Sequence, residues 1–312
     1  MTAPLKLTQR RLSSTLTGLA VGSALAISLV GCAGTGSDRP LVVVTTNILG
    51  DVTQAIVGDE AEVMTLMRPN ADPHSFEISA QEAGRILSAD LLVSNGLGLE
   101  EGLQQHLDAA ADEGIATLAA GDTIDVLDYA ESGAPDPHFW TDPARMLDVT
   151  DAIAEAVIAS VPGVEASVIR ANADGYIAEL ETLDAEMTTA FAAIDNDRRN
   201  LVTNHHVFGY LADRFDFTVV GAVIPGGSTL AAPSASDLRD LVDAITTAKV
   251  STIFAESSQP DRLVQVLADE AGVDVAVAEL FTESLSEPGE GADTYLTMMR
   301  TNTQRIATGL SP

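Results

Sequence analysis

Three histidines lie in short segments whose composition suits metal coordination. His74 and His138 each follow an Asp-Pro pair, and His205 follows Thr-Asn at the end of an apolar run. The chain has only five histidines among 312 residues, so their placement after apolar runs is informative. Neutral imidazole is the commonest nitrogen ligand of zinc, and three imidazoles with one carboxylate complete a tetrahedral site. These residues therefore predict a Zn²⁺ site.

His74 and His138 have the same local sequence pattern. Each is preceded by Asp-Pro and followed within two residues by an aromatic side chain, Phe76 or Phe139. The proline restricts the backbone ahead of the ligand, which lowers the entropic cost of closing a site, and the aromatic ring shields the imidazole from water. The repeated pattern favours a metal site over two unrelated turns.

The third nitrogen ligand is ambiguous by one residue. Neighbouring side chains of a strand point to opposite sides, so only one of His205 and His206 can face the same cleft as the other histidines. The fourth ligand is expected in the last loop, where Glu279, Glu283 and Glu287 are candidates. Glu256 ends another strand on the same side, where it could accept a hydrogen bond from a ring N–H of a coordinating histidine.

Strand and helix patterns alternate on both sides of one long helical stretch. The expected strands are short, apolar runs bounded by turn residues: 41–46, 62–67, 90–94, 116–119, 200–203, 217–224, 250–255 and 273–278. This alternation predicts an α/β fold of two Rossmann-like lobes with parallel sheets. The histidines fall at carboxyl ends of strands, where such sheets bind ligands.

The long helical stretch runs from about residue 164 to 194. Its apolar residues recur every three or four positions, and no proline interrupts them. A helix of roughly 30 residues would be about 45 Å long, which suits a rigid strut between lobes. We therefore expect a first lobe at 40–163, a linking helix at 164–196 and a second lobe at 197–312.

The amino terminus predicts export and anchoring. Three basic residues precede an apolar run that ends in Leu29-Val30-Gly31-Cys32, the pattern of bacterial lipoprotein signals. We expect residues 1–31 to be a signal peptide, Cys32 to be lipidated and 32–39 to be a tether, so that the protein is extracytoplasmic and held at the cell membrane. The alternative is an ordinary signal peptide with an incidental cysteine.

Charge excludes some partners. The formal net charge is −30, and removal of residues 1–31 takes away three basic and no acidic residues. Nucleic acid and anionic membrane surfaces are therefore not expected partners, and the only membrane contact expected is the lipid anchor.

The chain resembles the metal-binding solute receptors of bacterial ABC importers, the zinc and manganese class, and most closely the zinc receptors of the AztC type. The resemblance covers essentially the whole mature chain and is strongest in these motifs: 71–77, 136–141, 203–211, 225–237, 254–260 and 279–285. It implies two α/β lobes joined by a rigid helix, with metal bound between them. It also implies the ligands His74, His138, His205 and Glu283. Many relatives have Asp at the position of Glu283.

Some zinc relatives carry a histidine-rich loop before the second ligand. Here residues 128–134 are acidic and contain no histidine. The resemblance would then leave any role in attracting metal to Asp128, Glu131 and Asp136.

The resemblance implies a receptor that captures Zn²⁺ and delivers it to an ABC importer permease and its ATPase. We expect a monomer, with a metallochaperone as a further candidate partner. The alternatives are a manganese or other divalent metal receptor, a zinc hydrolase and an adhesin. No His-Glu-x-x-His motif is present, and a fourth protein ligand would close the position that a hydrolase needs for water, so we do not expect an enzyme.

Overall fold

The computed structural model describes residues 39–130, 132–224, 226–258, 262–271 and 275–311. The predicted signal peptide and Cys32 lie outside these residues. Among the described residues, no helix combines the length and apolar character that a membrane crossing needs.

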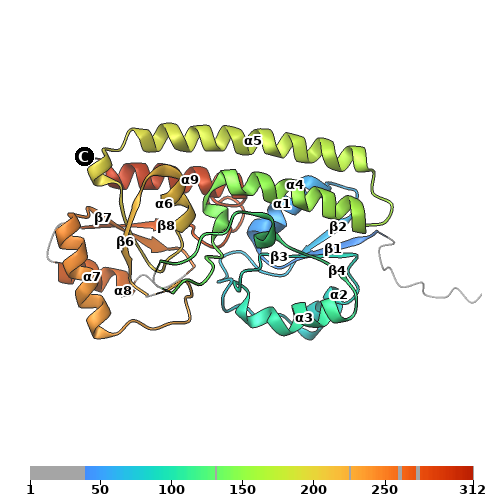
Figure 1. Ribbon diagram of the computed structural model, residues 1–312, viewed down its shortest axis with the longest axis horizontal. Helices are drawn as coiled ribbons and strands as arrows, with labels where there is room; N and C mark the ends of the chain where they lie inside the picture. Colours follow the sequence, from blue (N-terminus) through green and yellow to red (C-terminus); the bar gives the residue numbers. More distant parts are fainter. Residues whose placement is uncertain (1–38, 131, 225, 259–261, 272–274, 312) are drawn as a thin grey trace, which may run out of the picture. The chain divides into compact units, whose positions relative to one another are not determined.

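Two four-stranded parallel sheets form the centres of two lobes (Figure 1). The first sheet contains β1 (Leu41–Val44), β2 (Glu62–Thr65), β3 (Leu91–Ser94) and β4 (Ala116–Ala119). The second contains β5 (Asn200–Thr203), β6 (Thr218–Ala222), β7 (Thr252–Glu256) and β8 (Ala276–Leu280). Their strand orders are β2-β1-β3-β4 and β6-β5-β7-β8. In each sheet the order of the strands therefore reverses at the same place, between β1 and β3 in the first sheet and between β5 and β7 in the second. Parallel sheets of this kind bind ligands beyond the carboxyl ends of their strands. The α/β prediction is confirmed.

Helices cover both faces of each sheet. The helices of the first lobe are α1 (Asn47–Val57), α2 (Ala80–Ile86), α3 (Gln104–Asp112) and α4 (Pro143–Ser160). Those of the second lobe are α6 (Gly209–Phe215), α7 (Ala235–Ala248), α8 (Arg262–Ala271) and α9 (Tyr295–Leu310). In β1, Val42 and Val44 face the core formed with α1 and α4, whereas Leu41 and Val43 face α2 and α3. Burial on both faces explains why the strands are continuous apolar runs.

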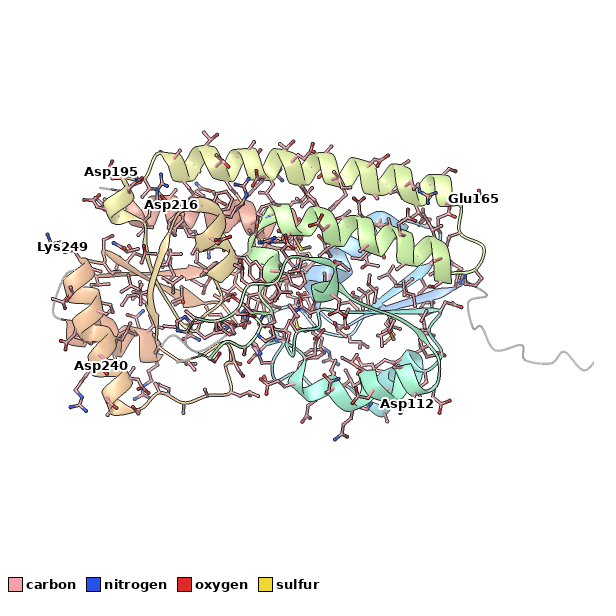
Figure 2. All side chains as sticks on the ribbon, in the orientation of Figure 1. Asp112, Glu165, Asp195, Asp216, Asp240 and Lys249 are labelled. Atoms are coloured by element: carbon pink, nitrogen blue, oxygen red, sulfur yellow. The ribbon has the colours of Figure 1, made fainter. Side chains whose placement is uncertain are left out.

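Helix α5 (Ala166–Ala192) runs alongside helices of both lobes (Figure 1). Its 27 residues give a length of about 40 Å at 1.5 Å per residue. It packs against α1 and α4 in the first lobe and against α9 next to the second sheet. Glu165 and Asp195 mark its two ends (Figure 2). The largest apolar cluster contains residues of α1, α4, α5, α6 and α9, so the two lobes share one core.

Several helix starts follow directly from local chemistry. The Ser79 hydroxyl accepts from the Glu82 amide and the Glu82 carboxylate accepts from the Ser79 amide, which forms a capping box. Asp142 caps α4 by accepting from the Ala144 amide at 2.9 Å, with a proline at the first helical position. Such caps fix where the loops that carry the histidines end.

Candidate metal site

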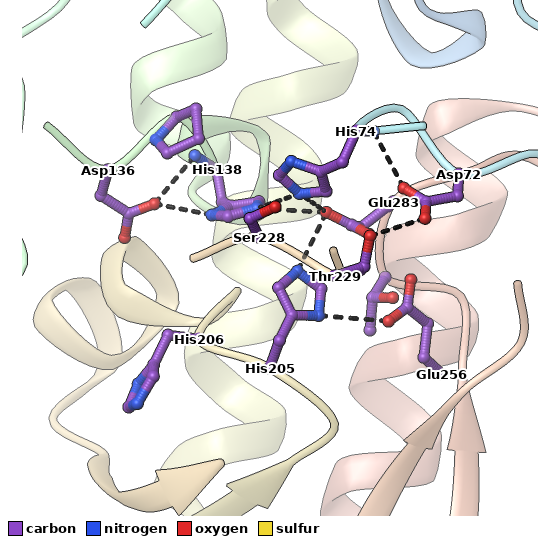
Figure 3. Close-up of polar contacts among 12 residues, drawn as sticks. Asp72, His74, Asp136, His138, His205, His206, Ser228, Thr229, Glu256 and Glu283 are labelled. Carbon is purple, nitrogen blue, oxygen red and sulfur yellow. Dashed lines mark hydrogen bonds and ion pairs between the residues drawn. The ribbon is translucent and has the colours of Figure 1, made fainter. Parts of the chain in front are cut away.

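Four side chains from both lobes meet at a single point (Figure 3). His74 lies in the turn after β2, and His138 immediately precedes a short 3₁₀ helix, Phe139–Thr141. His205 follows β5 and Glu283 follows β8. All four side chains are buried. Of the residues that sequence reasoning predicted as ligands, these four are brought together.

Four of the six distances between the donor atoms are close to those of a tetrahedral site. Oε1 of Glu283 lies 3.0 Å from Nε2 of His74 and 3.1 Å from Nε2 of both His138 and His205. The Nε2 atoms of His74 and His138 are 3.4 Å apart, and all four donors lie within 4.8 Å of one another. Zinc–ligand bonds of about 2.0–2.1 Å place tetrahedral donors about 3.3–3.4 Å apart. These contacts are therefore close to the edges of a tetrahedron around one ion.

Each imidazole has a carboxylate on the side away from this point. Nδ1 of His138 lies 2.8 Å from Oδ1 of Asp136. Nδ1 of His205 lies 3.2 Å from Oε2 of Glu256, at an angle that is poor for a hydrogen bond. Nδ1 of His74 lies 3.9 Å from Oε1 of Glu101. A carboxylate on Nδ1 favours the tautomer that leaves the Nε2 lone pair free, and it raises the basicity of the ligand.

Neighbouring charges and hydrogen bonds together outweigh the effect of burial on the pKa values of these groups. Burial alone would lower the pKa of His205, but the carboxylates of Glu283 and Glu256 raise that pKa well above its usual value. Burial likewise opposes protonation of His138, while hydrogen bonds that the imidazolium would donate to Asp136 and Glu283 raise its pKa. Burial would raise the pKa of Glu283, yet the three histidines lower it well below its usual range. In the metal-free protein, these pKa shifts favour protonated His138 and His205 beside an ionised Glu283.

Three buried polar atoms of the site have no hydrogen-bond partner among the described residues. They are Oε2 of Glu283, Nδ1 of His74 and Nδ1 of His205. A buried carboxylate oxygen without a partner costs about 1–3 kcal/mol or more. A cation bound by Glu283 would compensate that cost, so the residues present fit a metal ion.

The neighbouring candidates take other positions. The His206 ring points away from the donor atoms (Figure 3), and its amide donates to the carbonyl of Gly226 at 3.1 Å. The Glu279 carboxylate lies 3.4 Å from Arg305, and Glu287 is exposed. The cluster therefore contains His205 and Glu283 and none of these three alternatives.

Asp136 does not face solvent as a metal-attracting group would, so that expectation was wrong. Its side chain is buried, and Oδ1 accepts from the His138 amide at 3.0 Å and from the Tyr129 hydroxyl at 3.1 Å. The signal was present in the sequence: an Asp two residues before a histidine can accept from both its amide and its ring. Of the other two candidates, Asp128 is exposed and lines a pocket together with Asp136 and His206, and Glu131 is outside the described residues.

Residues 226–230 of the second lobe, which we term the bridging loop, contact the first lobe beside His74. The Ser228 hydroxyl donates to Oε1 of Glu101 at 2.7 Å, and the Thr229 hydroxyl donates to Oδ2 of Asp72 at 2.6 Å. Asp72 in turn accepts from the His74 amide at 2.8 Å. No sequence pattern predicted these contacts, because they join residues more than 100 positions apart.

The chain is similar to known proteins over most of its length. The family described as "Zinc-uptake complex component A periplasmic" matches residues 42–309. The iron ABC transporter substrate-binding lipoprotein MtsA of Streptococcus pyogenes serotype M1 is 29% identical over 307 residues, which cover 94% of this chain and 98% of MtsA. The manganese-binding lipoprotein MntA of Halalkalibacterium halodurans is 28% identical over 293 residues, covering 92% and 96%.

A solved structure has the same fold. The periplasmic zinc binding protein TroA of Treponema pallidum superposes with a TM-score of 0.82 at 29% identity, covering 88% of this chain and 100% of TroA. The metals named for these relatives are iron, manganese and zinc.

Proposed function

Since the chain belongs to the family of periplasmic zinc-uptake complex component A proteins, we propose that Zn²⁺ is the metal that it captures between its two lobes. Members of this family are metal-binding receptors of ABC transporters and are not enzymes. Such receptors work with a permease and an ATPase. The zinc hydrolase alternative is therefore set aside, and the identity of the metal is what we propose.

The donor set carries this proposal. Three imidazole nitrogens surround one carboxylate oxygen at 3.0–3.1 Å, and the described residues place no further carboxylate in the donor set. Three nitrogens and one oxygen in a tetrahedral arrangement suit Zn²⁺, whereas Mn²⁺ prefers more oxygen donors. We assign His74, His138, His205 and Glu283 as the ligands.

One observation supports the manganese or iron alternative. Oε2 of Glu283 is buried and has no partner among the described residues, so Glu283 could bind a metal through both oxygens. A fifth donor would suit a larger ion with a higher coordination number. The relatives named for manganese and iron are consistent with such a site.

We further propose that the receptor is anchored outside the cytoplasm through Cys32. MtsA and MntA are both named as lipoproteins, and the sequence pattern at 29–32 agrees with this.

Coordination number distinguishes the metals better than affinity, because nearly every nitrogen site binds zinc more tightly than manganese. X-ray absorption at the zinc edge of the loaded protein is expected to show four ligands at about 2.0–2.1 Å, three of them imidazoles. The metal content of protein recovered from its native host should be predominantly zinc. A five- or six-coordinate shell together with native manganese would contradict the proposal.

A further inference from the structure

The loop that carries Glu283 is fixed by two asparagines from opposite sides. The loop comprises residues 281–285, all of them buried. Asn302 of α9 accepts from the Phe281 amide at 3.0 Å and donates to the Phe281 carbonyl at 2.7 Å. Asn47 of α1 accepts from the Leu285 amide at 3.0 Å and donates to the Ser284 hydroxyl at 2.8 Å. Each asparagine thus uses both its amide oxygen and its amide nitrogen.

The two contacts are placed evenly about the ligand. Phe281 lies two residues before Glu283 and Leu285 two residues after it. Asn47 starts α1 of the first lobe, and Asn302 lies on α9, which packs against β8 of the second. The loop therefore follows the second sheet in sequence, yet it is hydrogen-bonded to both lobes.

Further contacts attach the loop to the first lobe. The Trp140 indole donates to the Thr282 carbonyl at 2.8 Å, and the Asn70 amide donates to the Leu285 carbonyl at 2.9 Å. Asn47 also donates to the Arg68 carbonyl at 3.1 Å, at the start of the turn that carries His74. Asn47 thus connects the backbones that bear two of the proposed ligands.

This arrangement determines where the carboxylate lies. Glutamate has a long side chain that loses rotamer freedom when it is fixed. Its Oε1 must nevertheless meet three imidazole nitrogens at 3.0–3.1 Å. Because the backbone is held on both sides of Glu283, metal binding has to restrict only the side chain of this residue.

We propose that Asn47 and Asn302 are positioning residues that set metal affinity through Glu283. The proposal rests on the metal-binding function proposed above. Neither side chain belongs to the donor set, and both are nearly fully buried, with exposed fractions of 7% and 3%.

A double-mutant cycle with Zn²⁺ tests the proposal. Asn47→Ala is expected to lower Zn²⁺ affinity by about 10–100-fold, the usual effect of removing a group that orients a metal ligand. In a Glu283→Ala background the same substitution should cost much less affinity, since two of the three hydrogen bonds of the Asn47 side chain are made to the loop that carries Glu283. With Co²⁺ as the probe, the visible spectra of Asn47→Ala and Glu283→Ala should shift in the same direction.

Asn172→Ala provides the matched control. Asn172 on α5 donates to the Ile56 carbonyl at 3.0 Å and joins two helices, and within the described part of the chain it has no hydrogen bond to the loop. Its loss should leave Zn²⁺ affinity unchanged. Asn302→Ala and Ser284→Ala keep the test available if Asn47→Ala does not fold, which the melting temperature of the metal-free protein would show.

The outcomes separate the two proposals. Wild-type affinity in both asparagine variants, or equal losses with and without Glu283, would overturn the positioning role alone. Failure of the unsubstituted protein to bind Zn²⁺ would overturn the proposed function and the positioning role together.

Discussion

The three imidazoles of the site share one arrangement at the scale of single residues. Each directs Nε2 towards Glu283 and has a carboxylate near Nδ1. The partners differ in exposure: Asp136 and Glu256 are buried, whereas the Glu101 side chain is 46% exposed. The orientations of His138 and His205 are therefore set by buried neighbours, and that of His74 depends on a pair nearer to solvent.

Substitution of the two adjacent histidines should have opposite results. His205→Ala should remove most of the Zn²⁺-dependent rise in melting temperature, because it deletes one of the proposed ligands. His206→Ala should retain that rise, since its ring points away from the site (Figure 3). Free Zn²⁺ at about 1,000 times the dissociation constant stabilises a protein by about 4 kcal/mol, so the difference is readily measured by calorimetry. The reverse result would move the ligand by one residue.

Zinc binding should release protons at neutral pH. The raised pKa of His205 means that the metal-free folded protein keeps this proton above pH 6.5. Its contribution to metal-free stability is thus present below pH 6.5 and is lost as pH rises through the raised pKa. Zn²⁺ binds neutral imidazole. As the pH is lowered, Zn²⁺ affinity should therefore begin to fall at a pH above 6.5.

Titration calorimetry in two buffers of different ionisation enthalpy measures this release. The binding enthalpy should differ between the buffers by an amount that corresponds to about one proton or more. An enthalpy independent of buffer near pH 7 would be inconsistent with a protonated His205.

At the scale of helices and strands, the sequence predicted the features that depend on residues close together in the chain. The spacing of Ser79 and Glu82 predicts a capping box, the Asp142-Pro143 pair predicts a helix start, and the apolar periodicity from 164 to 194 predicts a long helix; all three appear in the structure. Helix α1 begins at Asn47, where Thr46 caps it by accepting from the Leu49 amide. Local patterns therefore indicated the strand ends at which the histidines lie.

The contacts that orient the site could not be predicted in this way. Asn47 and Leu285 are 238 residues apart, and Ser228 and Glu101 are 127 apart. Pairing over such distances depends on how the two sheets pack, and no local periodicity records it. The choice between His205 and His206 also needed the position of the other lobe.

Gly175→Ala tests the contribution of α5 itself. Gly175 is exposed in the middle of this helix, and an added Cβ would have no atom within 4 Å. Glycine inside a helix costs about 0.5–1 kcal/mol relative to alanine, so the substitution should raise the free energy of unfolding by that amount. Zn²⁺ affinity should not change.

Gly50→Ala in α1 is the matched control. An added Cβ there would lie 2.2 Å from Oγ1 of Thr65, so this substitution should destabilise the protein. Denaturant unfolding of both variants compares the two cases directly. If Gly175→Ala instead lowered the free energy of unfolding, α5 would tolerate an added Cβ at this position less well than its exposed surface indicates.

At the scale of the whole described chain, the two lobes are joined by more than the site. One apolar cluster includes residues of both sheets and of α5, and the 281–285 loop is hydrogen-bonded to each lobe. Large opening would expose part of that cluster, at a cost of about 25 cal/mol for each Å² of apolar surface. We therefore expect metal binding to order loops rather than to swing one lobe.

Spin labels on the two lobes would measure whether metal binding moves one lobe relative to the other. Asp112 and Asp240 are exposed and lie on α3 and α7 (Figure 2), and cysteine labels can replace them once Cys32, the only native cysteine, is changed to serine. The distance distribution should narrow when Zn²⁺ is added, with little change in its mean. A large shift of the mean to shorter distances would show hinge closure instead.

The bridging loop has a consequence for timing. Its hydroxyls hold Asp72 and Glu101 beside His74, but none of its atoms belongs to the donor set. Differences in affinity between variants of one site lie mostly in how fast the ligand leaves. Displacement of the bridging loop should therefore shorten the residence time of the metal and weaken its binding together. A permease that displaced this loop would shorten that residence time without having to compete for the ion.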